Sequence, residues 1–421
     1  MPNIWKKYKL GDLTTKITKG TTPSTVGGKF LSSGVNYIKS EAVDYDGRID
    51  TSTFVYIDAD THEKLKRSQL EENDILFSIA GIYLGKTGMV TKEMIPANTN
   101  QAVAIIRLNQ LLANPKFIHL FLRNSETVRY VNSMSSQSAQ PNINLEEVGS
   151  LELNLPPLPE QKAIAEILSS LDDKIELNLQ TNKTLEEMAN ALYKHWFVDF
   201  GPFNDGKFIE SELGLIPEGF KLVSFKDVCF NHSKTYNFKG KEKVIFVNTG
   251  DILEGKFLHK NYSDIEGLPG QAKKIIELND ILFSEIRPGN KRYALIISDT
   301  SEYVVSTKFM VIRTNEKILP RILYRILRDE AIIKEFQNIA ESRSGTFPQI
   351  TFDAISGITF PMSNIGIQNQ FMDKVLPLEQ LIESNNIEIE NLKQTRDYLL
   401  PKLISGEIQV KDAAKKVKEV L

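Results

Sequence analysis

Cysteine and histidine are scarce in this 421-residue chain. Cys229 is the only cysteine, which excludes an intramolecular disulfide and a zinc site made of several thiolates. The histidines show no spacing typical of metal ligands; they are His62, His119, His195, His232 and His259. We therefore expect no metal ion in this chain.

An excess of one charge and long apolar runs are also missing. The formal net charge of −3 argues against a broad basic surface that coats nucleic acid, so any such contact must be confined to a few loops. No run approaches the roughly 18 apolar residues of a membrane span, and the start MPNIWKKYKL lacks an apolar signal core. We expect a cytoplasmic protein with no membrane contact. The length predicts two domains or more.

An internal repeat is present. The hexapeptide NDILFS at 73–78 recurs identically at 279–284, an offset of 206. Three further matches keep the same order: Ile106-Arg107 with Ile312-Arg313, Pro141 and Ile143 with Pro348 and Ile350, and Leu155-Pro156 with Phe360-Pro361. Ordered matches at nearly one offset indicate a duplicated domain.

Each half follows the same order of local patterns. Short β-rich runs, such as 34–43 and 243–252, come first and are punctuated by Gly and Asn. Helical runs at 115–124 and 320–329 follow, each opened by a proline that suits a first helical turn. Polar loops, another short strand and a long helical stretch then complete each half. The mixed order predicts an α+β fold with a projecting helix after each domain.

The two long stretches carry apolar heptad seams. The first seam reads Ile164, Leu168, Leu171, Ile175, Asn178, Asn182, Leu185, Ala189, Leu192 and Trp196. Adding 207 gives Phe371, Val375, Leu378, Ile382, Asn385, Ile389, Leu392, Arg396, Leu399 and Leu403. Such seams predict two helices that pack on each other. The alternative is that each helix caps its own domain, but about 39 residues would make a rod of roughly 58 Å, longer than a small domain is wide.

One residue disturbs this pattern. Pro377 lies inside the second stretch, so that helix should start late or kink there.

Motifs that suggest catalysis fail on inspection. Residues 80–87 fit a relaxed phosphate-binding loop, but the following residues 88–91 predict a strand where such a loop must open a helix. A methyltransferase loop of the Asn/Asp-Pro-Pro-Tyr/Phe type is missing. Residues 155–158 read Leu-Pro-Pro-Leu, so leucines stand where the motif has Asn or Asp and Tyr or Phe. The fragment Glu254-Gly255-Lys256 is too short to indicate a nuclease. We therefore expect no enzymatic activity in this chain.

Three segments carry a family resemblance. LPPLPEQ at 155–161 opens the first long helix, ALYKHWFVDF at 191–200 closes it, and LLPKLISGEI at 399–408 closes the second. Together with the repeat, they resemble specificity subunits of type I restriction-modification enzymes over essentially the whole chain. The second opener, PMSNIGIQ at 361–368, has drifted from the first.

The resemblance implies the organisation of the chain and its partners. It implies two target-recognition domains at 1–157 and 199–363. The first spacer helix would lie at 158–198, residues 364–421 would hold the second spacer helix and a C-terminal tail, and the two helices would pack as an antiparallel coiled coil. Each domain would read half of a split site in double-stranded DNA. Two methylation subunits would dock on the helices, and motor-nuclease subunits would complete the complex. This chain would then need no cofactor, and S-adenosylmethionine, ATP and Mg would bind the partner subunits.

Base reading needs Arg, Lys, Asn and Gln side chains on loops that reach the major groove. In the first half the candidates are Lys39, Ser40, Tyr83, Lys86, Thr87, Asn100, Gln101, Gln137, Gln140 and Asn142. In the second half they are Arg287, Asn290, Lys291, Arg292, Thr307, Lys308, Arg343, Ser344 and Thr346. These loops could be ordinary solvated loops, but their chemistry diverges between the copies as two readers of different half-sites should.

Alternative functions are a solitary DNA-binding regulator and a coiled-coil assembly scaffold without DNA contact. The seam asparagines yield a separate hypothesis. If the helices run antiparallel, residue x faces a residue near 567 − x, so Asn182 faces Asn385 and Asn178 lies against Ile389. An asparagine pair inside an apolar seam would fix the helix register.

Overall fold

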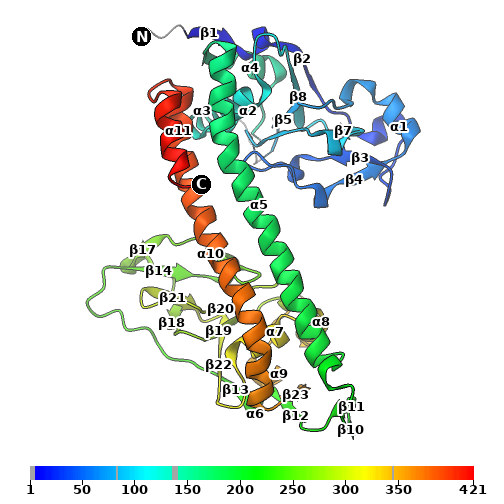
Figure 1. Cartoon of the computed structure of the whole chain (residues 1–421), viewed down its shortest axis with the longest axis vertical. Helices are drawn as coiled ribbons and strands as arrows, with labels where there is room; N and C mark the ends of the chain where they lie inside the picture. The colour runs from blue at the N-terminus through cyan, green and yellow to red at the C-terminus, as the bar shows by residue number, and fades with distance from the viewer. Residues whose placement is uncertain (1–4, 82–83, 135–140, 344–345) are drawn as a thin grey trace. The chain divides into compact units, whose positions relative to one another are not determined.

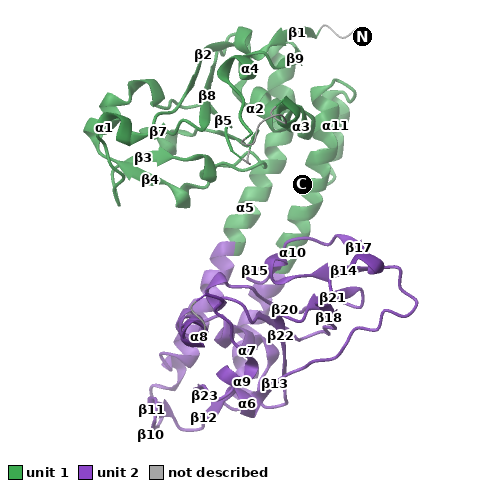
Figure 2. Ribbon diagram, turned by 180° about the vertical axis from the view of Figure 1, so that it is seen from behind, with its two compact units in different colours: residues 1–182, 383–421 green, residues 183–382 purple. Residues whose placement is uncertain are grey.

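The computed structural model describes residues 5–81, 84–134, 141–343 and 346–421. Its internal contacts divide the chain into unit 1, residues 1–182 with 383–421, and unit 2, residues 183–382 (Figure 2). Each unit therefore contains part of both long helices, α5 (Leu158–Phe197) and α10 (Ile365–Ile404). Within the described ranges, none of the helices is long and apolar enough to cross a bilayer.

Unit 1 combines two sheets with short helices (Figure 1). Its strands are β1 (Lys6–Lys9), β2 (Thr14–Lys19), β3 (Val35–Ile38), β4 (Val55–Ile57), β5 (Ile75–Ser78), β6 (Thr87–Met89), β7 (Ala97–Thr99), β8 (Val103–Leu108) and β9 (Glu152–Leu155). Its other helices are α1 (Ala59–Lys64), α2 (Pro115–Arg123), α3 (Ser125–Met134), α4 (Leu145–Gly149) and α11 (Val410–Lys418). The sheets have the orders β2-β8-β5-β6 and β4-β3-β7, and β1 pairs with β9.

Unit 2 repeats this arrangement. Its strands are β10 (Phe208–Ser211), β11 (Gly214–Pro217), β12 (Lys221–Ser224), β13 (Cys229–Asn231), β14 (Lys243–Val247), β15 (Ile252–Leu253), β16 (Lys256–Phe257), β17 (Tyr262–Asp264), β18 (Ala272–Lys274), β19 (Ile281–Ser284), β20 (Tyr293–Leu295), β21 (Tyr303–Ser306), β22 (Phe309–Thr314) and β23 (Thr359–Met362). Its shorter helices are α6 (Phe225–Val228), α7 (Pro320–Leu327), α8 (Glu330–Arg343) and α9 (Phe352–Ile355). The orders β13-β22-β19-β20 and β17-β14-β21-β18, with β12 paired to β23, confirm the predicted duplication.

The repeated hexapeptide forms the central strand of each unit. In β5, Ile75 and Phe77 belong to the core shared with α2 and α5, whereas Leu76 belongs to the core beneath the second sheet. The equivalent strand β19 splits its side chains between two cores in the same way. Because successive side chains of a strand point to opposite faces, an unbroken apolar run requires cover on both faces. Helices cover one face and a second sheet covers the other.

A buried ion pair explains why both halves retain the aspartate of the hexapeptide and the arginine of the Ile-Arg match. Arg107 donates to both carboxylate oxygens of Asp74 at 2.8 Å, and Arg313 donates to those of Asp280 at 2.7 and 2.9 Å. Both aspartates are almost completely buried. The hydrogen bond to Asp74 is the main cause that raises the pKa of Arg107. Each pair ties the turn before the central strand to the neighbouring strand.

A buried glutamine starts each long helix. Gln161 accepts a hydrogen bond from the Asn114 backbone at 2.8 Å and donates to the carbonyls of Leu112 and Pro156. Gln368 makes the equivalent bonds to Leu319, Lys317 and Ser363. The drifted opener at 361–368 has therefore kept the residue that joins the helix to the domain, because these buried backbone groups need a partner.

The helices pack antiparallel within each unit. In unit 1, Lys174 pairs with Glu388 at 3.2 Å, and Asp172 pairs with Arg396 at 3.2 Å. In unit 2, Phe371 stacks edge to face on Phe197 with ring centroids 4.9 Å apart. Most residues of both predicted seams are buried. Figure 1 shows a segment of α5 beside a segment of α10 in each unit, which confirms the predicted coiled coil.

The predicted contact between Asn182 and Asn385 is present, and the predicted partner of Asn178 differs by one residue; the role of the pair in fixing the register stays a prediction. Asn385 donates to the side-chain oxygen of Asn182 at 2.8 Å. Asn178 is buried and donates to Glu388 at 2.9 Å, one residue from the predicted Ile389. Asn178 and Asn385 are both buried in the seam and do not point to solvent.

Of the two alternatives predicted for Pro377, the late start of the second helix is wrong, and the kink stays a prediction. α10 begins at Ile365 and continues through Pro377 to Ile404. Pro377 is exposed, whereas its neighbours Val375 and Leu378 pack into the core of unit 2. Tertiary packing on both sides of the proline offsets the local cost of its missing hydrogen bond.

Removing the buried carboxylate should destabilise unit 1. Asp74→Ala leaves the Arg107 guanidinium without its buried partner, and we expect a loss of about 3 kcal/mol in the free energy of unfolding, measured by urea titration. Glu71→Ala is the control, because Glu71 pairs with the same arginine but is largely exposed, and it should cost less than about 1 kcal/mol. Equal losses would contradict a special role for the buried pair.

Replacing the asparagine pair should stabilise the chain. In an Asn182→Leu, Asn385→Leu double variant, an apolar contact replaces a polar one in the seam, and we expect about 1 kcal/mol of added stability. Differential scanning calorimetry should show this as a rise of a few degrees in Tm. Asn391→Leu, at an exposed position of α10 outside this hydrogen-bond network, is the control and should change little. A lower Tm would mean that the asparagine pair is itself net stabilising.

Candidate functional site

Three predicted loops of unit 1 meet beyond the end of β5. The backbone of Ile79 donates to Ala102 at 2.9 Å and accepts from Ile143 at 3.0 Å. Gly81 donates to Pro141 at 3.0 Å, and Ala80 and Asn142 form an isolated β-bridge. The loop after β5, the loop before β8 and the loop before α4 therefore form one junction.

Unit 2 builds the same junction from equivalent residues. Glu285 donates to Lys308 at 2.9 Å and accepts from Ile350 at 2.8 Å, and Arg287 donates to Pro348 at 3.0 Å. Ile286 and Gln349 form the matching bridge. Each of these residues lies 206 or 207 positions after its unit 1 counterpart. The duplication thus preserves the backbone of the junction.

A fourth loop joins the junction in each unit. Strands β3 and β7 are parallel and bring Ile38 opposite Thr99, so Lys39 and Asn100 follow at the same sheet edge. In unit 2, β14 and β21 bring Val247 opposite Val305. Asn248 therefore takes the place of Lys39.

The candidate residues of unit 1 differ in accessibility. Gln101 and Asn142 are exposed, while Lys39, Ser40, Lys86 and Asn100 are partly buried. The Lys39 ammonium lies 4.6 Å from the centre of the Phe30 ring, and that of Lys86 lies 5.6 Å from the Tyr45 ring. Both distances suit cation–π contacts. Thr87 is fully buried in β6, so its hydroxyl does not reach the surface.

The candidate residues of unit 2 separate into two groups. Arg287, Asn290, Arg343 and Thr346 are exposed, and Thr307 and Lys308 are partly buried. Lys291 pairs with Glu330 and Glu254, and the hydrogen bond to Glu330 is the main cause that raises its pKa. Arg292 donates to the carbonyls of Gly250 and Ile252. Lys291 and Arg292 thus hold the loop in shape.

Four further candidates, Tyr83, Gln137, Gln140 and Ser344, lie outside the described residues.

Sequence reasoning missed three residues of the junction. Gln349 lies 3.4 Å from the Lys308 ammonium and is the counterpart of Asn142 at an offset of 207. Asn248 follows the parallel strand β14, and Glu285 directly follows the repeated hexapeptide. For Glu285 and Gln349 the repeat itself was the available signal, because both lie between matched positions of the two halves. Asn248 precedes the first matched position, so only the strand register identifies it.

The phosphate-loop interpretation is excluded by the local structure. Residues after Lys86 form the strand β6, as predicted, so the turn does not open a helix whose N-terminus could bind phosphate. The described part of the chain also has no group of three or more His, Cys, Asp or Glu placed to hold a metal ion. Cys229 is buried, and burial raises the pKa of its thiol to about 12.

Partly buried ion pairs attach the α+β domain of each unit to the helix segments of the same unit. In unit 1, Arg123 of α2 donates to Asp172 of α5 at 2.6 Å, and Arg396 of α10 donates to Asp172 and to Asp46. In unit 2, Arg325 of α7 donates to Glu379 of α10 at 2.5 Å, and Arg328 donates to Glu186 of α5. These contacts give each junction a fixed orientation on its own helix segments.

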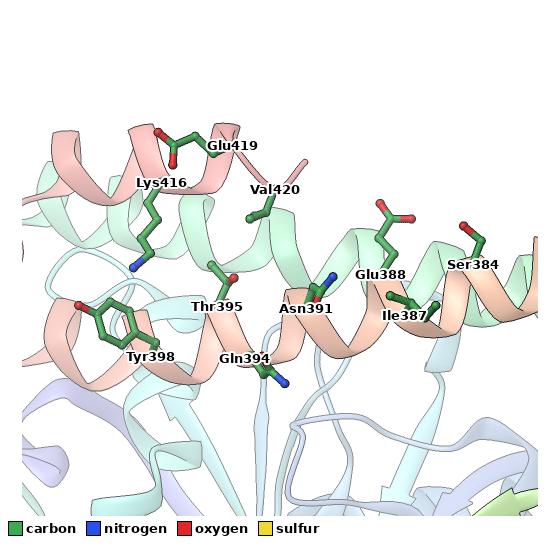
Figure 3. Close-up of a pocket in the computed structure, with 10 residues that line it drawn as sticks. All are labelled: Ser384, Ile387, Glu388, Asn391, Gln394, Thr395, Tyr398, Lys416, Glu419 and Val420. Atoms are coloured by element: carbon green, nitrogen blue, oxygen red, sulfur yellow. The ribbon is translucent and has the colours of Figure 1, made fainter. Parts of the chain in front are cut away.

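The helices of unit 1 also form a groove of about 670 Å³ between α10 and α11. Figure 3 shows Lys416 of α11 reaching toward Tyr398 of α10, and the ammonium lies 3.9 Å from the ring centre. Ile387 in the same groove is largely exposed. The groove is lined by helix residues and none from the loop junction.

Two copies of one α+β domain, each presenting divergent loops and each packed on antiparallel helices, define a protein built for duplicated recognition. The family described as the type I restriction modification DNA specificity domain matches residues 2–187 and again 217–394. The chain belongs to this family and carries its domain twice. Its function is sequence-specific DNA recognition.

Individual relatives agree with this assignment. The specificity subunit of the type I restriction enzyme HindI from Haemophilus influenzae is 46% identical over 181 residues, which span 43% of this chain and 39% of that relative. The MjaVIII specificity subunit from Methanocaldococcus jannaschii is 26% identical and aligns over 98% of this chain and 95% of its own. The S subunit of M. genitalium shares the fold, with a TM-score of 0.58, 16% identity and 96% coverage of both chains.

An exposed arginine of the second junction should support DNA binding. We expect Arg287→Ala to weaken binding of DNA and to reduce the slope of log affinity against log salt by about 1, because one phosphate contact is lost. Fluorescence anisotropy at several salt concentrations measures both effects. Lys226→Ala removes the same charge from the exposed surface of α6 and should leave the slope unchanged. Identical slopes for both variants would place Arg287 outside the interface.

Proposed function

We propose that this chain is the non-catalytic specificity subunit of a type I restriction-modification complex, and that each recognition domain reads one half of a bipartite DNA site. The observation that supports this most is the duplicated junction. Its backbone hydrogen bonds are the same in both units, whereas its side chains differ.

The side chains that differ between the two junctions include residue types that can bind base edges. Unit 1 has Ala102 and Asn142 where unit 2 has Lys308 and Gln349. Lys donates to guanine, whereas Asn and Gln pair with adenine through two hydrogen bonds. A constant backbone with variable side chains suits two domains that bind duplex DNA alike but read different sequences.

The helix pair would act as the spacer between the two half-sites. Asn182 and Asn385 meet inside the seam and would fix its register. A slip of one heptad would move a helix by about 10 Å, or roughly three base pairs of DNA. The spacer length of the DNA site would therefore depend on this polar contact.

The catalytic steps would belong to partner subunits. Two methylation subunits would dock on the helices, where the groove between α10 and α11 exposes Ile387 beside charged side chains (Figure 3). Motor-nuclease subunits would complete the complex. S-adenosylmethionine, ATP and Mg would bind these partners, and this chain would bind double-stranded DNA.

A domain exchange tests the proposal. We expect that replacing residues 1 to about 150 with the equivalent segment of a relative changes only one half of the methylated site, because each junction lies within one unit. The measurement is methylation-sensitive sequencing of a host that carries this chain with its methylation subunit. Exchange of a matching segment with identical loop residues is the control.

Several outcomes would contradict the proposal. A change in both half-sites would show that the domains do not read independently. The assembly scaffold would be favoured if the methylated DNA showed no bipartite site. It would also be favoured if gel shifts of the complex with DNA showed no sequence preference at moderate salt. Sequence-specific binding by the chain without any methylation partner in its host would favour a solitary regulator.

A further inference from the structure

Glu285 lies at the centre of the second junction. Its backbone bonds to both neighbouring loops, and its side chain is only half buried. The counterpart in unit 1, 206 positions earlier, is Ile79, which is almost fully buried. The two junctions therefore differ most sharply at this position, where one has a carboxylate and the other an aliphatic side chain.

Two lysines flank this carboxylate. The Lys274 ammonium is buried and donates to the Phe309 carbonyl at 2.6 Å, and Lys308 lies 3.4 Å from the Gln349 side-chain oxygen. Both lysines favour the charged form of Glu285 electrostatically. At the same offset of 206, unit 1 has Ser68 and Ala102 in their places. The whole group of charges is thus specific to unit 2.

The carboxylate lacks a hydrogen-bond donor within the described ranges. The two lysines direct their ammonium groups to other oxygens, and neither comes within 4 Å of the carboxylate as an ion pair. Burial is the main cause that raises the pKa of Glu285, and the lysines oppose it. A half-buried carboxylate is stabilised when a donor reaches it. The exposed part of the Glu285 side chain is where a ligand would supply that donor.

We propose that Glu285 reads a cytosine in the second half-site by accepting a hydrogen bond from its exocyclic amino group. This inference rests on the proposed function. In the major groove, guanine and thymine present hydrogen-bond acceptors, which would repel a carboxylate. Adenine has an amino donor, but its N7 acceptor lies beside that donor and would repel the carboxylate as well. Cytosine presents an amino donor in the major groove with no N7 acceptor beside it. Lys274 and Lys308 favour the charged form of this carboxylate and oppose the effect of burial.

The test compares two charge-matched variants in the complex with the methylation subunit. Glu285→Gln removes the charge at the junction, and Glu316→Gln removes the same charge from an exposed loop residue between β22 and α7. The DNA substrates are duplexes of the wild-type site with each base in turn at every position of the second half-site. Methylation rates and competitive binding give the preference at each position.

We expect the wild-type complex and Glu316→Gln to prefer cytosine at one position. In Glu285→Gln this preference should fall roughly tenfold to a hundredfold, with the first half-site unchanged. Glu285→Asp keeps the charge and should retain part of the preference. The Tm of Glu285→Gln should stay within a few degrees of the wild type, because the carboxylate accepts no hydrogen bond from the described residues and only its longer-range attraction to Lys274 and Lys308 is lost.

The outcomes separate this inference from the proposed function. If the wild-type complex reads no bipartite site, the proposed function itself fails. If it reads one and Glu285→Gln keeps every preference within about twofold, Glu285 reads no base. A fall in Tm with a loss of preference at all positions would show that the carboxylate supports the loop, which also overturns the inference.

Discussion

The rest of each unit depends on the burial of one apolar strand on both faces. Strands β5 and β19 carry the same Ile-Leu-Phe sequence, and neither face of them can meet water without a cost of several kcal/mol. One face packs against helices and the other against a second sheet. Since both faces are occupied, polar side chains can gather only beyond the ends of these strands, and the recognition loops lie there.

Buried charges give these apolar layers a defined orientation. Arg396 occupies a position of the heptad seam that an aliphatic residue would normally take. Burial tends to lower its pKa, but Asp397, Asp172 and Asp46 raise it above the ordinary value. Because Asp46 belongs to the recognition domain and Asp172 to α5, one guanidinium joins the domain to both helices of unit 1. An apolar contact would have less directional preference than these hydrogen bonds.

Duplication explains how one chain can keep its architecture while its two recognition sites diverge. The Asp–Arg pairs, the helix-starting glutamines and the junction backbone recur because each satisfies buried polar groups. Side chains of the loops do not have to satisfy buried polar groups, so they can differ between the two units. Ile79 and Glu285 make the same backbone hydrogen bonds although their side chains differ. Specificity can therefore change without a change in fold.

The sequence by itself determined the repeat, the α+β class, the helix seams and the pairing of Asn182 with Asn385. The repeat follows from the constant offset between the halves, and the seams follow from the heptad spacing of apolar residues. Once two helices are taken as antiparallel, one register defines every pair of facing residues, including Asn182 and Asn385. Only the tertiary structure decided which loop residues remain available. Thr87 is buried, and Lys291 and Arg292 bind Glu330 and backbone carbonyls of the same unit. The availability of a side chain depends on neighbours far away in the sequence, whereas secondary structure depends on local pattern.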